Sequence, residues 1–106
     1  MPALTVQIVR WVEDYQPGIV CCEFEDATGR RHTVIEKLPV VANADLDAAS
    51  AYPHPGVIRC QVLARWQDSQ GRELARISTV RPDSVESTEG LSEFVVLANQ
   101  LAPDCL

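Results

Sequence analysis

The chain of 106 residues carries nine Lys and Arg against fifteen Asp and Glu, a formal net charge of −6 at pH 7. This length predicts one domain, residues 1–106, and an apolar share of 46% is that of a globular protein with a small core. The acidic balance argues against nucleic acids and anionic membranes as partners, because both require a basic face, and it leaves basic protein surfaces open.

The N-terminus has no basic segment followed by an apolar run, so the sequence predicts no signal peptide. No stretch approaches the roughly 20 apolar residues that cross a bilayer. We therefore expect a cytoplasmic protein of bacterial type, and in that compartment cysteines remain reduced.

Alternation of apolar and polar residues predicts β-strands along much of the chain. The expected strands are residues 4–11, 19–25, 31–41, 57–67 and 72–80. Residues 81–90 are polar and acidic and predict a loop. Residues 91–101 fit either a strand or a helix, and consecutive bulky β-formers favour the strand. The tail after Ala102 is expected to fray.

A stretch that occurs twice organises these elements. Residues 17–30 and 55–72 both begin with Pro-Gly, place a Cys five positions after the Pro, and close with Asp-x-x-Gly-Arg. In such a turn Asp accepts local backbone hydrogen bonds and Gly adopts a positive φ, so both copies predict β-hairpins. Residues 43–52, which begin with the capping residue Asn43 and precede two prolines, predict a short helix between them.

The predicted fold class is mainly β. We expect a small antiparallel barrel or a strongly bent sheet of about six strands, built on two similar hairpins with one short connecting helix. Closure of a barrel would remove the exposed sheet edges. In the strand at 19–25, the face of Val20, Cys22 and Phe24 is expected to point to the core.

The sequence predicts no metal site, no cofactor and no catalytic residues. Cys21 and Cys22 are adjacent, so on a strand they point to opposite faces and cannot bind one ion together. Cys22 and Cys60 are expected in the core, and Cys21 outside it beside Glu23, a carboxylate that opposes a reactive thiolate. Ser87 lacks the glycines of a nucleophile elbow. A Cys–His nucleophile pair whose members meet only in the folded protein remains an alternative. The sequence therefore disfavours enzymatic activity without excluding it.

The leading functional hypothesis is a small acidic protein-binding domain without catalysis. One form is an antitoxin-like or immunity-like inhibitor, whose carboxylates cover a basic active site. The partner would be a protein, a basic one in this form, or a second copy in a homodimer. The candidate partner-binding residues are Glu86, Ser87, Glu89, Glu93, Asp45 and Asp47.

A second surface lies on the strand at 57–67. Arg59, Gln61, Leu63 and Arg65 share its outer face, which is polar with an apolar centre and suits a protein contact or a two-fold dimer. If the two hairpins lie side by side, this face would instead pair with the carboxylates of the strand at 19–25.

The alternative hypothesis is a small-molecule-binding β-barrel with weak enzymatic activity. Its interior pocket would be lined by Trp11, Trp66 and His32. Tryptophans in a chain of this size are more often core anchors. An interior filled by side chains would exclude this hypothesis, and a lined pocket of a few hundred Å³ would favour it.

Overall fold

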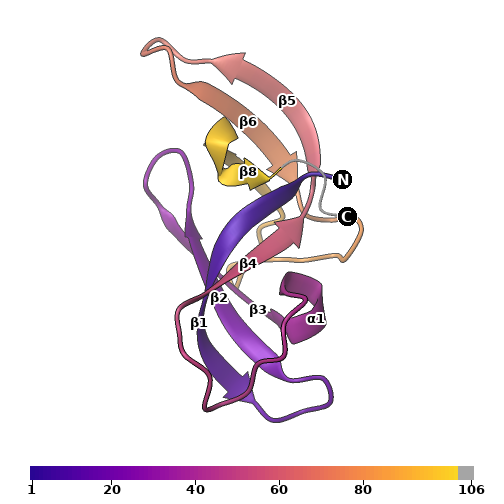
Figure 1. Cartoon of the computed structure of the whole chain (residues 1–106). Helices are drawn as coiled ribbons and strands as arrows, with labels where there is room; N and C mark the ends of the chain where they lie inside the picture. Colours follow the sequence, from indigo (N-terminus) through magenta and orange to yellow (C-terminus); the bar gives the residue numbers. More distant parts are fainter. Residues whose placement is uncertain (103–106) are drawn as a thin grey trace.

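Two antiparallel sheets form the protein, as seen in a computed structural model that describes residues 1–102 (Figure 1). The first sheet has the order β3-β2-β1-β4, with β8 also paired to β1, and the second has the order β5-β6-β7. The elements are β1 (Ala3–Glu13), β2 (Ile19–Glu25), β3 (Arg31–Lys37), α1 (Leu38–Val41), β4 (His54–Arg59), β5 (Gln61–Gln67), β6 (Glu73–Ser78), β7 (Glu93–Leu97), the 3₁₀ turn η1 (Ala98–Gln100) and β8 (Leu101–Ala102).

The mainly β, antiparallel prediction is confirmed. The described part of the chain has eight strands where about six were expected, and it closes no barrel. No helix within residues 1–102 is long and apolar enough to cross a membrane. The expected fraying after Ala102 concerns residues that lie outside the described part.

The two hairpins expected from the repeat are present as β2–β3 and β5–β6. Their turns have the same hydrogen bonds. In one, the Asp26 N–H donates to the Arg30 carbonyl at 2.9 Å, and in the other the Asp68 N–H donates to the Arg72 carbonyl at 3.0 Å. Gly29 and Gly71 have φ of 84° and 80°. The Asp-x-x-Gly-Arg pattern thus specifies one turn geometry twice.

The repeat does not extend to the Pro-Gly ends, and the single strand expected at 57–67 is wrong. The chain leaves the first sheet after β4, which pairs with β1, and enters the second sheet as β5. Cys60 lies between the two strands, fully buried, and its N–H donates to the Pro2 carbonyl at 3.0 Å. Gly56 lies inside β4, where a Cβ would approach the Val41 carbonyl oxygen to 3.0 Å, whereas Gly18 precedes β2.

The short helix expected at 43–52 is also wrong. The helix present is α1, one turn that follows β3 directly and buries Leu38 and Val41. Residues 43–52 form turns instead, because the Asp47 carboxylate accepts the Ala49 N–H at 2.8 Å while the Asp47 N–H donates to the Ser50 hydroxyl at 2.9 Å. These local side-chain bonds compete with a helical backbone.

The core lies between the two sheets. Ile8, Val20 and Val34 enter it from the first sheet and Ile77 and Val96 from the second, each at most 1% exposed. The inward face expected for β2 is confirmed, since Val20, Cys22 and Phe24 all belong to this core. The strand favoured for residues 91–101 is confirmed for β7, after which the chain makes the turn η1.

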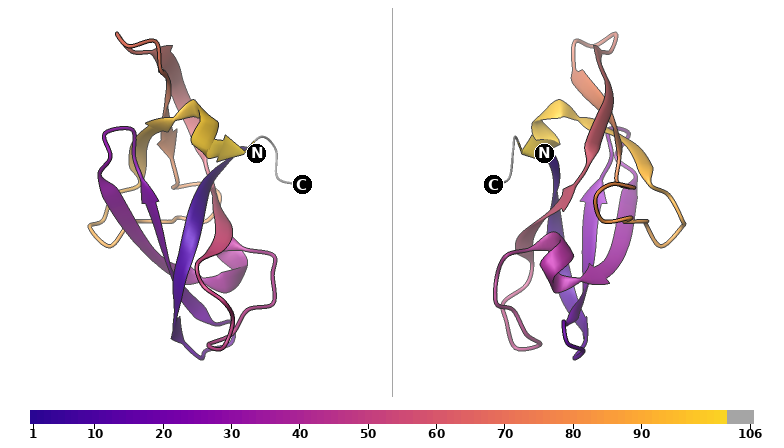
Figure 2. Two further views of the ribbon diagram at one scale, coloured as in Figure 1. Left: turned by 60° about the vertical axis from the view of Figure 1, so that its left-hand side comes forward. Right: turned by 90° about the vertical axis from the view of Figure 1, so that its right-hand side faces the viewer.

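The molecule is elongated, 45 Å along its longest axis against 24 Å along the other two. The views in Figures 1 and 2 agree that the β5–β6 hairpin projects from one end. The connection from α1 to β4 lies at the opposite end.

Candidate functional site

The candidate site is the outer edge of β5, the terminal strand of the second sheet. β5 pairs with β6 along one side. Within residues 1–102, no backbone hydrogen bond from another segment reaches its other side. None of its seven residues is buried, and Leu63 and Trp66 are 44% and 40% exposed. An unpaired edge of this kind presents N–H and C=O groups to any extended chain.

β6 anchors this edge to the rest of the molecule. Ala75 and Ile77 are fully buried, and Leu74 is 7% exposed. At the tip, the Arg72 guanidinium donates to the Ala27 carbonyl of the other hairpin's turn at 3.3 Å. The edge strand is therefore held in place by its neighbour while its own residues face solvent.

A β-bulge divides β5 into two parts. The register with β6 shifts between Val62 and Ala64, which leaves Leu63 as the extra residue. From Ala64 to Gln67 the pairing is regular, with Trp66 opposite Leu74. Residues directly opposite share a face, so Trp66 covers Leu74 on the face away from Ala75.

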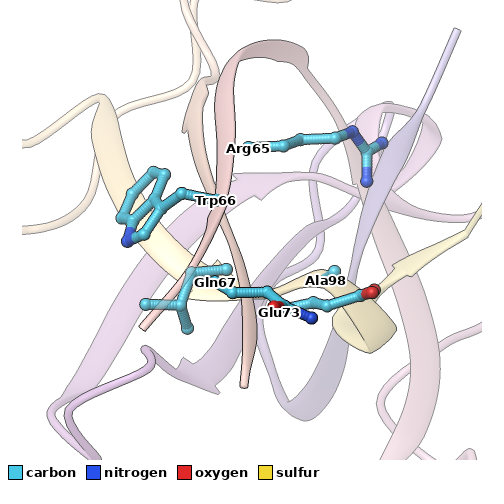
Figure 3. Close-up of a pocket in the computed structure, with 6 residues that line it drawn as sticks. Arg65, Trp66, Gln67, Glu73 and Ala98 are labelled. Carbon is cyan, nitrogen blue, oxygen red and sulfur yellow. The ribbon is translucent and has the colours of Figure 1, made fainter. Parts of the chain in front are cut away.

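A surface pocket of about 330 Å³ lies beside Trp66. Its lining residues are Arg65, Trp66, Gln67, Glu73, Leu74 and Ala98. Figure 3 shows the side chains of Arg65 and Trp66 extending to opposite sides of the strand, as alternation requires. Side chains of both faces of β5 thus reach the pocket rim.

The hairpin is basic on a protein that is acidic elsewhere. Residues 61–78 hold three arginines against two carboxylates, and the rest of the chain holds six basic against thirteen acidic residues. Arg59 binds Asp83 at 2.8 Å, and Arg72 binds Asp68 at 2.8 Å. Among the described residues, Arg65 and Arg76 form no ion pair. The condition for pairing this face with Glu23 and Glu25 is not met, because β2 and β5 belong to different sheets and Arg31 lies beside both carboxylates.

The predicted acidic site falls on two separate connections. Glu86, Ser87 and Glu89 lie between β6 and β7 and Glu93 begins β7, whereas Asp45 and Asp47 lie between α1 and β4. The carboxylates are exposed. Ser87 is 6% exposed, and its hydroxyl oxygen accepts the Leu91 N–H at 3.1 Å, so it shapes the loop from inside.

This loop is held against the first hairpin by two contacts. The Thr88 N–H donates to the Thr33 carbonyl of β3 at 2.8 Å. Glu89 forms an ion pair with Arg30 at 2.6 Å, with both side chains 55% exposed. Of the loop's predicted binding residues, Glu89 is thus already engaged with the protein's own surface.

The three residues expected to line one pocket lie in three places. Trp11 is half-buried near the end of β1, packs over Gly18 and donates from its indole N–H to Asp14 at 2.7 Å. His32 pairs in register with Phe24 near the far end of β2. Trp66 belongs to the other sheet and lines the surface pocket described above.

His32 is enclosed, 3% exposed, between two aromatic rings. Its ring centroid lies 5.2 Å from that of Phe24 and 4.9 Å from that of Phe94. Nε2 lies 2.8 Å from an Asp26 carboxylate oxygen, and the buried Nδ1 has no hydrogen-bond partner among the described residues. The only signal for this pair in the sequence is the six-residue spacing of Asp26 and His32 across a hairpin turn.

Several hydrogen bonds fix the ionised state of Asp26. Partial burial by itself would raise the pKa of this carboxyl group. Hydrogen bonds from the side chains of Thr28 and His32, and from the N–H groups of Thr28 and Arg30, outweigh it and lower the pKa to about 2. Asp26 therefore acts as the centre of the turn and as the partner of the buried imidazole.

The described cysteines are thiols in buried positions. Burial raises the pKa of Cys22 to about 12 and also raises the pKa of Cys60. Cys21 lies outside the core cluster as expected, yet it is only 3% exposed, and burial raises its pKa despite the positive charge of Arg10. Within residues 1–102 no group of three His, Cys, Asp or Glu side chains is placed to hold a metal ion.

The functional feature that sequence analysis missed is the position of β5 at a sheet edge. The sequence pattern predicts one outer face for Leu63 and Arg65, but the bulge at Leu63 places Arg65 on the face of the buried Ala75. Strand order, which decides whether a strand is central or terminal, does not follow from that pattern. Comparison of this chain with protein-family models, curated proteins and solved structures finds no match.

Proposed function

We propose that this chain is a protein-binding domain without catalysis, and that the open edge of β5 is its binding strand. The observation that carries the proposal is an edge strand whose residues are all exposed or half-exposed while its neighbour β6 is anchored in the core. The protein would act in the cytoplasm, where cysteines such as the buried thiols of Cys22 and Cys60 remain reduced.

The mode of binding is strand addition. An extended partner segment beside β5 would satisfy the free backbone groups, and those hydrogen bonds supply affinity, while alternate side chains supply specificity. Leu63 and Trp66 offer apolar contacts to such a segment. A second copy of the chain could present the same edge, which would give a homodimer.

Capture of partners from the source lysate by the tagged protein tests the proposal. Leu63→Asp together with Trp66→Asp places charge on the edge and should abolish capture of the specific partner. Ile35→Asp is the matched control, because Ile35 has the same 44% exposure as Leu63 and lies on an edge strand of the other sheet. A partner lost equally from both variants, or from neither, would contradict a role for β5.

A second candidate assigns partner binding to the acidic residues, in an antitoxin-like or immunity-like inhibitor. The exposed carboxylates of Glu86, Glu89 and Glu93 favour it, since they could cover a basic active site. Glu86→Gln together with Glu89→Gln should weaken capture of a basic partner and reduce its sensitivity to salt. Unchanged capture by this variant would remove the loop from the binding surface.

Small-molecule binding is the remaining candidate, with the pocket beside Trp66 as its supporting observation. A barrel with an internal site near Trp11 would need an open lumen, and core side chains occupy the space between the sheets. Thermal-shift screening of metabolites tests this candidate. A ligand that stabilises the protein but not Trp66→Ala would support it, and an identical shift in both would not.

A further inference from the structure

We propose that the segment which pairs with β5 is an acidic, extended peptide of a partner protein, and not a second copy of this chain. This inference rests on the proposed function, because it names the chemistry of the segment that occupies the same edge. Its basis is the placement of arginines on both faces of the hairpin.

Register assigns each arginine to a face. Arg65 pairs with Ala75 and shares its face of the sheet. Arg76 pairs with Ala64, two residues from Trp66, and so lies on the opposite face with that indole. Figure 3 shows Arg65 and Trp66 diverging from the strand, which agrees with this assignment. A strand added to β5 would therefore have Arg65 beside it on one face and, on the other face, Arg76 of β6 one strand further in, across the small side chain of Ala64.

Both arginines are available to a partner. Arg65 and Arg76 are exposed and form no ion pair among the described residues, in contrast to Arg59 of β4 and to Arg72 of the same hairpin. Successive side chains of an extended peptide alternate between faces. Carboxylates at neighbouring positions of the peptide would consequently meet one guanidinium on each face, and an apolar residue beside them would contact Trp66.

The same charges disfavour a second copy at this edge. Two-fold pairing of β5 with itself would bring together two hairpins that each hold more arginines than carboxylates. The bulge at Leu63 and the charge of Arg65 are also devices by which soluble proteins prevent edge-to-edge pairing. An acidic segment would not be repelled by these arginines. It could also pair with Ala64–Gln67 alone, where the strand is regular, and so avoid the bulge.

A fluorescein-labelled peptide of Val-Glu-Glu-Val repeats, which presents carboxylates on both faces when extended, is the probe (the Val-Glu peptide), and the same peptide with Lys in place of Glu is its control (the Val-Lys peptide). Fluorescence anisotropy should detect binding of the Val-Glu peptide and none of the Val-Lys peptide, and affinity should fall at high salt. Amide chemical-shift changes should concentrate in residues 61–67. Equal binding of both peptides, or binding of neither, would overturn the proposal.

Charge reversal at both arginines, Arg65→Glu with Arg76→Glu, should weaken Val-Glu binding by about tenfold or more and allow the Val-Lys peptide to bind. Arg10→Glu, an exposed arginine of the other sheet, is the matched control and should change affinity less than about twofold. Proper folding of each variant is checked by the dispersion of its amide spectrum.

Sedimentation velocity separates failure of this inference from failure of the proposed function. The unliganded protein should sediment as a monomer. A dimer that Leu63→Asp abolishes would show that a second copy occupies the β5 edge, which overturns the acidic peptide and retains the binding strand. A monomer with no shift changes in residues 61–67 when either peptide is added would contradict both.

Discussion

Replacement of Asp26 by Asn should destabilise the protein, because one carboxylate serves both the first hairpin turn and the buried His32. One oxygen of Asp26 accepts the N–H groups of Thr28 and Arg30, and the other lies 2.8 Å from Nε2 of the imidazole. Asn can retain the turn by accepting with its carbonyl oxygen. Its NH₂ group would then face Nε2, which drives the imidazole proton to Nδ1, a buried atom with no described partner.

The pKa of Asp26 sets the magnitude of the expected effect. Its fall from 3.8 to about 2 corresponds, at about 1.4 kcal/mol for each pKa unit, to roughly 2 kcal/mol of stability at neutral pH. A buried N–H left without an acceptor costs about 1–3 kcal/mol, which is of the same size. Asp26 lies in a surface turn, so solvent screening makes these figures upper limits.

The direction of the pH dependence follows from the same pKa. Because the carboxyl pKa is lower in the folded protein than in the unfolded chain, ionised Asp26 stabilises the fold fully above the unfolded value. This contribution is lost as pH falls from 3.8 towards about 2. The stability of Asp26→Asn should therefore fall less steeply over that interval than the stability of the original protein.

Asp68→Asn is the matched control, since Asp68 occupies the same position in the second hairpin turn and binds the exposed Arg72 guanidinium in place of a buried histidine. Urea unfolding at neutral pH and at several acidic pH values measures both variants. Asp26→Asn should lose clearly more stability than Asp68→Asn. Equal losses, or an unchanged pH slope in Asp26→Asn, would refute the role assigned to the Asp26–His32 pair.

Three further predictions concern separate parts of the molecule. Gly18→Ala should lower the free energy of unfolding by about 1–3 kcal/mol and shift tryptophan fluorescence, because the new Cβ overlaps the Trp11 ring. Cys22 should react with a thiol reagent only after unfolding, since it is fully buried and its pKa is raised to about 12. Glu89→Gln should cost under about 1 kcal/mol in urea unfolding, because the ion pair with Arg30 is exposed.

The hairpin ends could be predicted from the sequence because their determinants are local. Asp26 and Asp68 each bind backbone groups within four residues, and the following glycines need a positive φ. The strand break at Cys60 could not be predicted in the same way. Alternation continues through Val57–Gln67, and nothing in that pattern records that β4 and β5 pair with different strands.

The helix predicted for residues 43–52 does not form, because the composition of that segment favours a helix while its side-chain contacts favour turns. Residues 43–52 combine a capping residue with alanines, yet the Asp47 side chain binds local backbone there. The turn that does become helical, α1, gains burial of Leu38 and Val41 against the core. For so short an element, packing outweighs propensity, and packing depends on residues distant in the sequence.

The two edges of the hairpin sheet explain why β5 stands out as the candidate site. At the other edge of this sheet, β7 is partly covered, because the Val95 carbonyl accepts the Ala27 N–H at 2.9 Å from the first hairpin's turn. The edge strand β3 of the first sheet is likewise met by the Thr88 N–H. The first contact comes from the β2–β3 turn and the second from the β6–β7 loop, where the two sheets meet. Neither segment contacts the outer edge of β5, which lies on the projecting side of the molecule. Its protection is limited to a bulge and an arginine, which deter a like-charged strand and leave the edge open to an acidic one.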